Sequence, residues 1–171
     1  REKETGSFEG LVSTPVQGAE YILGKLAAYL VYSLLSGLLV FLIAILWFQV
    51  PFWGDPALLI LLTLDYLLAT MGFSILVATF VGSQQAAMLI VLLIFFVPSF
   101  FLTGLITPVN PESPGAKMIA MALPATHYVT ISRGLFLKGV GLADLQAPAL
   151  ALAMMGLGSL GLSIRVFRKE A

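Results

Sequence analysis

The hydrophobic pattern divides the chain into a charged beginning and four long apolar stretches. A helix that crosses a hydrocarbon core about 30 Å thick needs roughly 20 apolar residues. Four stretches reach that length, at residues 26–50, 57–81, 86–106 and 147–166. Short loops, "PFWGDP" and "GSQQ", join the first three, so we expect those helices to pack as antiparallel neighbours. The pattern predicts an all-α integral membrane protein with four transmembrane helices.

Two shorter apolar pieces, at residues 115–123 and 128–137, lie between the third and fourth stretches and are separated by Pro124. At about 1.5 Å per residue, each piece is about 15 Å long, which is half of a bilayer core. Pro124 lacks a backbone donor and disfavours helix at Leu123. We therefore expect an outer re-entrant helical hairpin over residues 114–138, and the alternative is a pair of interfacial helices lying flat.

Residues 1–25 predict a cytoplasmic amphipathic helix and a capped entry to the first span. Around Phe8, apolar residues recur at the i, i+3, i+4 spacing of one helix face. Thr14 and Gln17 fit a capping box for a new helix that starts at Pro15. The segment either docks to another protein or is a polar juxtamembrane linker, and the spacing alone leaves both possibilities open.

Composition supports the membrane assignment and removes several function classes. Hydrophobic residues form 59% of the chain and charged residues 11%, against roughly 45–50% and about 25% in soluble domains. The net charge is zero and there is no basic tract, so nucleic acid is not an expected partner. With no cysteine and one histidine, we expect no disulfide and no metal bound through thiolates or clustered imidazoles.

The basic residues indicate an orientation. Four spans place both ends of the chain on one side of the membrane. That side would hold Arg1, Lys3, Lys25, Arg165, Arg168 and Lys169, and the other side would hold Lys117, Arg133 and Lys138. The positive-inside rule then predicts that both ends are cytoplasmic, with residues 167–171 as a short tail. We expect a multi-pass protein of the plasma membrane, typical of a prokaryotic inner membrane.

One carboxylate, Asp65, lies inside a predicted span. Such a group costs about 2.5–3.5 kcal/mol at a helix centre, so it should face protein or water. Tyr66, Thr70 and Ser74 form a neighbouring polar stripe with Thr63 at helical spacing. These residues are candidates for a substrate pathway that accepts a polar or cationic molecule. A hydrogen-bonded, purely structural Asp65 fits the sequence equally well.

Two prolines and an arginine are candidates for a hinge or gate. Pro98 removes the hydrogen bond to the carbonyl of Ile94 and should kink the third span, as a hinge or as a static bend. Pro124 and Arg133 lie in the predicted hairpin, where an outer gate is possible. Arg133 and His127 also fit the simpler role of satisfied polar groups at the membrane interface.

Two motifs give the chain a family resemblance. The opening "REKETGSFEGLVSTPV" is similar to the pattern R-E-K-E-x-G-[ST]-x-E-x-L-x-x-[ST]-P of type-2 ABC exporter permeases, which runs on to a Gly-Lys pair. The matching residues are Arg1, Glu2, Lys3, Glu4, Gly6, Ser7, Glu9, Leu11, Thr14, Pro15, Gly24 and Lys25. The later "THYVTISRGLFLKG" resembles a second family motif, [TH]-Y-x-x-x-x-R-G-x-x-L-[KR]-G, although Ala125 departs from the Asn-Pro that usually precedes it. The resemblance covers nearly the whole chain.

The resemblance implies that the opening segment is a coupling helix that sits in a groove of a separate cytoplasmic ABC ATPase subunit. The residues expected to couple to the ATPase are Glu2, Glu4, Gly6, Phe8, Glu9, Leu11, Thr14 and Pro15. ATP and Mg²⁺ would bind in that partner, and this chain would bind no cofactor and catalyse no reaction. Two permease halves, alike or different, would work as a dimer in lipid by alternating access. The family pattern also places two further spans before Arg1.

Other functions fit the sequence less well. The chain lacks the G-x-x-x-x-G-K-[ST] loop that cradles nucleotide phosphates. An aspartyl intramembrane protease needs two carboxylates that share a proton, whereas a single one lies within the predicted spans. A passive channel or secondary transporter is compatible with Asp65 and the broken helices, but it would not need the coupling segment.

Overall fold

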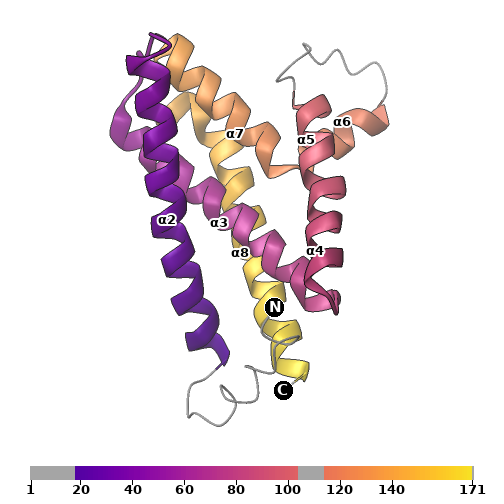
Figure 1. Ribbon diagram of the computed structural model, residues 1–171. Helices are drawn as coiled ribbons and strands as arrows, with labels where there is room; N and C mark the ends of the chain where they lie inside the picture. Colours follow the sequence, from indigo (N-terminus) through magenta and orange to yellow (C-terminus); the bar gives the residue numbers. More distant parts are fainter. Residues whose placement is uncertain (1–17, 104–113, 171) are drawn as a thin grey trace.

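The computed structural model describes residues 18–103 and 114–170, and every element in these residues is helical (Figure 1). The helices are α2 (Gly18–Leu46), α3 (Pro56–Phe80), α4 (Gln84–Val91), α5 (Val97–Leu102), α6 (Pro114–Met121), α7 (Pro124–Arg133) and α8 (Leu142–Glu170). Two short π-helical segments, η1 (Leu92–Phe96) and η2 (Gly134–Lys138), continue α4 into α5 and extend α7.

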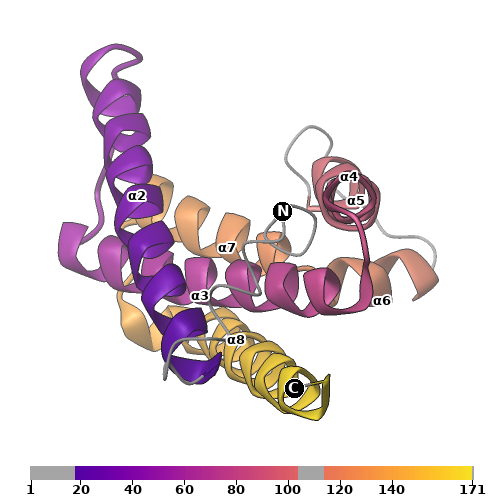
Figure 2. The same ribbon diagram turned by 60° about the horizontal axis from the view of Figure 1, so that its bottom comes forward.

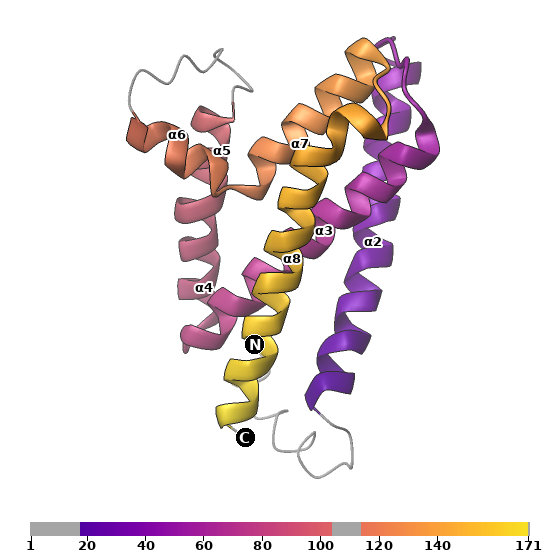
Figure 3. The same cartoon turned by 180° about the vertical axis from the view of Figure 1, so that it is seen from behind.

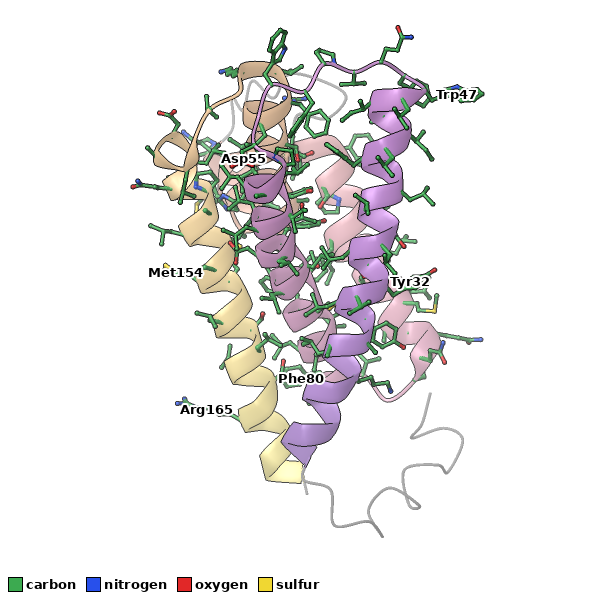
Figure 4. The ribbon with its side chains drawn as sticks, turned by 90° about the vertical axis from the view of Figure 1, so that its left-hand side faces the viewer. Tyr32, Trp47, Asp55, Phe80, Met154 and Arg165 are labelled. Carbon is green, nitrogen blue, oxygen red and sulfur yellow. The ribbon has the colours of Figure 1, made fainter. Side chains whose placement is uncertain are left out.

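Four helical segments are long and apolar enough to cross a membrane. They are Gly24–Leu46, Pro56–Phe80, Gln84–Leu102 and Leu142–Ser163. This confirms the predicted all-α class with four candidate spans. In Figure 4, Trp47 and Asp55 lie at one end of the bundle, whereas Phe80 and Arg165 lie toward the opposite end. We call the end with Trp47 and Asp55 the outer end of the bundle, after the predicted orientation, and the opposite end the inner end.

The first span ends at Leu46, whereas the sequence analysis extended it to residue 50. The chain leaves the helix through a wide turn in which the Val50 N–H donates to the Ala44 carbonyl at 3.1 Å. Gln49 takes a left-handed conformation in this turn, with φ of 52°. The early reversal brings the ring of Phe52 back against the bundle, where it is half-buried.

The last span begins at Leu142, before the predicted start at residue 147, and its helix continues through Pro148. The extra turn is favoured by the burial of Leu145, which is 3% exposed in the hydrophobic core. Asp144 in the first turn also complements the positive end of the helix dipole. Both effects depend on tertiary structure or on short-range electrostatics that a hydrophobic pattern does not record.

Local capping residues set two other helix starts. Asp55 caps α3, because its Oδ1 accepts a hydrogen bond from the Ala57 N–H at 2.8 Å, and Pro56 occupies the first helical position. Ser83 caps α4 by accepting from the Ala86 N–H at 3.2 Å. The residues "DP" and "GS" in the short loops therefore form helix N-termini.

Helices α3 and α8 form the centre of the bundle and share its most extensive contact (Figure 3). A Cβ placed on Gly156 would lie 3.2 Å from the Ala69 backbone nitrogen, so the two backbones touch. Gly72 of α3 approaches Ser159 of α8 even more closely. Helix α7 packs against both α3 and α8. The buried core is Leu59, Leu62, Ala69, Ile131, Leu135, Leu145 and Leu152.

Much of the remaining surface is apolar and exposed, as expected for helices solvated by lipid. The candidate spans Gly24–Leu46 and Gln84–Leu102 bury none of their most apolar window in the described residues. Trp47 and Trp53, which are 82% and 72% exposed, lie at the outer end of α2 and in the loop after it. Exposed tryptophans at a helix end are typical of the membrane–water interface.

The region between the third and fourth spans contains two short helices, α6 and α7, that meet at Leu123 in an open V (Figure 1). The break falls one residue before Pro124, and Pro124 starts α7 rather than lying in the gap between two helices. Leu123 is extended, with φ of −93° and ψ of 123°, as expected for the residue before a proline. Entry of this V into the outer leaflet stays a prediction.

Candidate transport pathway

A pair of stacked tyrosines joins α3 to α7. The rings of Tyr66 and Tyr128 are nearly parallel, at 14°, with centroids 4.3 Å apart. The Tyr128 hydroxyl lies 2.8 Å from Thr63 Oγ1, and Thr63 Oγ1 donates to the Leu59 carbonyl at 2.7 Å. Because the threonine hydroxyl has one hydrogen, Tyr128 is the donor in their hydrogen bond. Tyr128, which the sequence analysis did not select, therefore completes the polar group around Tyr66.

The other hydroxyls of the predicted stripe are bonded within α3. Thr70 Oγ1 lies 3.1 Å from the Tyr66 carbonyl and 3.0 Å from the Leu67 carbonyl. Ser74 Oγ donates to the Thr70 carbonyl at 2.9 Å, and its residue is exposed. The hydroxyl hydrogens of Thr70 and Ser74 are therefore bonded to backbone carbonyls of α3. These two side chains could only accept hydrogen bonds from a transported molecule.

Asp65 lies on a different face of α3 from this stripe. Successive residues of an α-helix are rotated by about 100°, so Asp65 is about 160° away from Thr63 around the helix. The side chain is half-buried. Within residues 18–103 and 114–170, no hydrogen bond or ion pair to its carboxylate is found. The structure therefore separates the predicted pathway into a tyrosine–hydroxyl group and an isolated carboxylate, and a role for either stays a prediction.

The candidate hinge residues occupy distinct environments. Pro98 follows the π-helical segment η1, in which the Val97 N–H donates to the Leu92 carbonyl. Pro124 is buried at the start of α7. Arg133 is exposed in the last turn of α7, near the outer end of the bundle. Hinge or gate motion at these residues stays a prediction.

His127 links the two arms of the V. Its Nε2 lies 2.9 Å from the carbonyl of Met121, which is the last residue of α6. One of the terminal carbonyls of α6 is thereby satisfied by a side chain of α7. This contact agrees with the simpler role foreseen for His127, that of a satisfied polar group.

The outer end of α7 is held against the loop between α2 and α3. The Trp53 N–H donates to the Phe136 carbonyl at 3.4 Å. Gly139, with φ of 59°, lies so close to this loop that a Cβ would be 2.7 Å from the Trp53 carbonyl oxygen. The rings of Phe41, Phe52 and Phe136 meet edge to face, with centroids 5.0–5.7 Å apart. This set, the outer aromatic cluster, connects α2, the loop and η2, and the sequence analysis missed it.

The predicted coupling residues Glu2, Glu4, Gly6, Phe8, Glu9, Leu11, Thr14 and Pro15 lie outside the described residues. In the described part of the chain, no group of three or more His, Cys, Asp or Glu side chains is placed to hold a metal ion. The candidate site is thus a set of hydroxyls, aromatic rings and one carboxylate between apolar helices.

The four candidate spans agree with the hydrophobic pattern of the sequence, and comparison with known proteins gives the family. The model described as "ABC-2 family transporter protein" matches residues 1–165, so the chain belongs to the ABC-2 transporter family. It is therefore a multi-pass part of an ABC transporter membrane subunit, a type-2 permease.

Individual relatives come from Escherichia coli (strain K12). The chain is 31% identical over 139 residues to "Probable multidrug ABC transporter permease YbhS", with 81% of this chain and 37% of the relative covered. It is 28% identical over 142 residues to "Probable multidrug ABC transporter permease YbhR", covering 83% and 38%. It is 28% identical over 170 residues to "Inner membrane transport permease YhhJ", covering 99% and 45%. The chain thus spans less than half the length of these relatives, and no solved structure matches it.

Proposed function

We propose that this chain forms part of the membrane subunit of an ATP-driven exporter, which moves its cargo by alternating access. The observation that carries the proposal is the family match over residues 1–165, because it includes the opening segment with the coupling motif. ATP and Mg²⁺ would bind in a separate ABC ATPase, and a second permease half would complete the complex. Both ends of the chain would be cytoplasmic, by the positive-inside argument.

The geometry of α2 supports a route for mechanical coupling. This helix starts at Gly18, directly after the motif in sequence, and Phe41 near its far end belongs to the outer aromatic cluster. At about 1.5 Å per residue, Phe41 lies roughly 35 Å along the helix from Gly18. A displacement of the cytoplasmic end would therefore reach Phe136 on η2 through ring contacts. Energy would pass from the ATPase side to the outer hairpin without a chemical step in this chain.

The proposed cargo is an apolar or amphiphilic small molecule. Two E. coli relatives carry the word "multidrug" in their names, and we extend that class to this chain. The half-buried polar groups of α3 and α7 are few and mostly bonded to the protein, as at Thr70 and Tyr128. Such a surface favours apolar contact with a small number of hydrogen bonds, as in ligand pockets generally.

The coupling role can be tested by cross-linking, because residues 1–171 contain no cysteine and any cysteine elsewhere in the complete permease can first be replaced. In the complete permease, Phe8→Cys is expected to cross-link to the cognate ATPase with a yield that changes when ATP is added. The matched control is Gly82→Cys on the exposed α3–α4 turn, which would face the same side of the membrane and has open space around its Cβ. Equal adducts from both variants would indicate random collision.

A second variant tests coupling in function. If Phe8 fills a groove of the ATPase, Phe8→Ala should lower export while the ATPase continues to hydrolyse ATP. Unchanged export, or the absence of any adduct with folded protein and ATPase present, would contradict the proposal. That result would favour a passive channel or a secondary transporter.

A further inference from the structure

The second sequence motif ends in "RGLFLKG", which forms the end of α7, the segment η2 and the turn after it. Leu135 in η2 is fully buried, and Gly139 ends the segment in the left-handed conformation that glycine favours. The N–H groups of Gly139 and Val140 both donate to the Gly134 carbonyl. The Phe136 carbonyl, which a regular α-helix would pair with the Val140 N–H, therefore accepts from a donor outside the helix.

That donor is in the loop between α2 and α3, where the Trp53 N–H lies 3.4 Å from the Phe136 carbonyl oxygen. Two glycines let the backbones touch. A Cβ on Gly54 would lie 2.8 Å from the Leu135 carbonyl oxygen, and a Cβ on Gly139 would lie 2.7 Å from the Trp53 carbonyl oxygen. Real Cβ atoms do not approach so closely, so any other residue at either position would displace a backbone. We call these residues the outer tie: Trp53, Gly54, Leu135, Phe136 and Gly139.

The outer tie joins the far end of α2 to the helix that carries Tyr128. On the α2 side, the rings of Phe41 and Phe52 pack edge to face on the ring of Phe136. On the other side, η2 continues α7, where Tyr128 stacks on Tyr66 of α3. Figure 3 shows the outer ends of α2 and of α7 side by side. A continuous set of contacts therefore runs from α2 through the loop to the tyrosine pair.

Two features make the outer tie a firm connection. It consists of backbone atoms in direct contact, and the segment that supplies one side of it includes Leu135, which is 0% exposed in the hydrophobic core. The loop is also fixed beyond the tie, because Asp55, directly after Gly54, caps α3 through a 2.8 Å hydrogen bond. Further spans or a second permease half would pack around these contacts and would not replace them, because the atoms of the tie already touch one another.

We propose that the second motif is the docking site of the α2–α3 loop, and that the outer tie makes α2 and α7 move together during transport. A displacement of α2 then changes the position of Tyr128 on α7. This inference rests on the proposed export function, for which it names the fixed connection between the coupling span and the tyrosine pair. Trp53, Gly54 and Gly139 are positioning residues, because they act on the candidate pathway through α7.

Cysteine pairs in the complete permease with its ATPase, otherwise free of cysteine, test whether the tie stays closed. Trp53→Cys with Lys138→Cys places one thiol on the loop and one on η2, at exposed side chains beside the Trp53–Phe136 hydrogen bond. A short, reducible bifunctional thiol reagent should bridge this pair equally with ATP and with ATP plus vanadate, and export should continue after bridging. The control pair, Trp53→Cys with Met118→Cys, should not be bridged, because α6 lies on the other side of the bundle (Figures 1 and 2). Bridging that depends on nucleotide, or export that stops until the reagent is reduced, would overturn the proposal.

Gly139→Ala tests the tie by opening it. The added Cβ does not fit beside the Trp53 carbonyl oxygen, and alanine is strained at a φ of 59°. We expect export per ATP hydrolysed to fall several-fold, whereas Gly141→Ala, with open space around its Cβ, should leave this ratio unchanged. A merely structural defect would lower export and ATP hydrolysis together, because less folded permease would be present. Equal ratios in the two variants would overturn the proposal.

If Gly139→Ala does not fold, the aromatic contact of α2 with η2 gives the same test. Phe41→Leu removes the ring that α2 contributes, and Phe48→Leu, at an exposed ring just after α2, is the matched control. Export per ATP should fall in the first variant alone, and equal ratios would overturn the proposal. If the native complex hydrolyses ATP without export, the proposed function fails. Bridging of the Trp53–Lys138 pair then decides on the tie, which equal bridging in both nucleotide states supports and unequal bridging overturns.

Discussion

Replacing Gly72 by alanine should destabilise the contact between α3 and α8 on which the bundle depends. A Cβ built on Gly72 falls on the hydroxyl of Ser159 and lies 3.2 Å from Leu160 Cγ. Ser159 is 4% exposed, and its Oγ donates to the Gly156 carbonyl at 3.1 Å. To make room, the serine must rotate away from this bond or the two helices must separate.

The cost of Gly72→Ala follows from these contacts. A lost hydrogen bond contributes about 0.5–1.5 kcal/mol, and overpacking in a filled core costs typically about 1–3 kcal/mol. The higher helix propensity of alanine than of glycine stabilises the variant by up to about 1 kcal/mol. The net destabilisation is then about 2 kcal/mol, which corresponds to roughly 4–8 °C in the unfolding midpoint of a domain of this size.

The assay is the temperature at which the detergent-purified permease loses its monodisperse peak. Gly158→Ala in α8 is the matched control, because a Cβ there meets nothing within 4 Å, and it should be neutral or slightly stabilising. Gly72→Ala combined with Ser159→Gly should be more stable than additivity of the two single changes predicts, since the overlap is removed. If Gly72→Ala behaves like Gly158→Ala, the close α3–α8 contact is not what stabilises the bundle.

Further variants address the tyrosine pair and the carboxylate. Tyr128→Phe removes the hydrogen bond to Thr63 and should destabilise the permease by about 0.5–1.5 kcal/mol in the same thermal assay. Tyr128→Ala also removes the ring stacked on Tyr66 and should destabilise it clearly more. Equal destabilisation by the two variants would argue against a contribution from stacking. Asp65→Asn should leave thermal stability and assembly unchanged or improved, because a charge is removed from a span, and should lower export of cationic cargo in vesicles. Unchanged export would make Asp65 a structural residue.

The number and order of the spans follow from sequence because each is a long apolar stretch bounded by capping or turn residues. Asp55-Pro56 and Ser83 begin helices with their own side chains, so nearby residues determine these starts. The end of α2 and the start of α8 differ by several residues from the ends of the apolar stretches, because they depend on contacts between distant segments. Phe52 must reach the outer aromatic cluster, and Leu145 must reach the core.

The partners of the polar residues were not predictable from sequence. Tyr128 meets Thr63 across 65 positions of the chain, and the hairpin motif in which Tyr128 lies gives no sign of this partner. Thr70 and Ser74 occur at the same helical spacing as Thr63, yet their hydroxyls turn to their own helix. A row of polar residues at helical spacing thus predicts one face of a helix, but it does not predict which hydroxyls bond to their own helix and which bond to a neighbouring helix.

The contacts between helices are hard to predict from this sequence because the solvent around the helices is lipid. In water, the apolar face of a helix identifies its buried side, whereas lipid and protein interior accept the same apolar side chains. Gly72, Gly156 and Gly158 are therefore alike in sequence, although the first two lie against a neighbouring backbone or side chain and the third has open space. The protein-facing side of a membrane helix differs from its lipid-facing side in how closely a neighbouring helix can approach. In the sequence, only small residues indicate such a close approach. In this chain the close approach at Gly72 and Gly156 identifies the contact between α3 and α8 as a protein–protein contact, which the apolar composition of the two helices does not reveal.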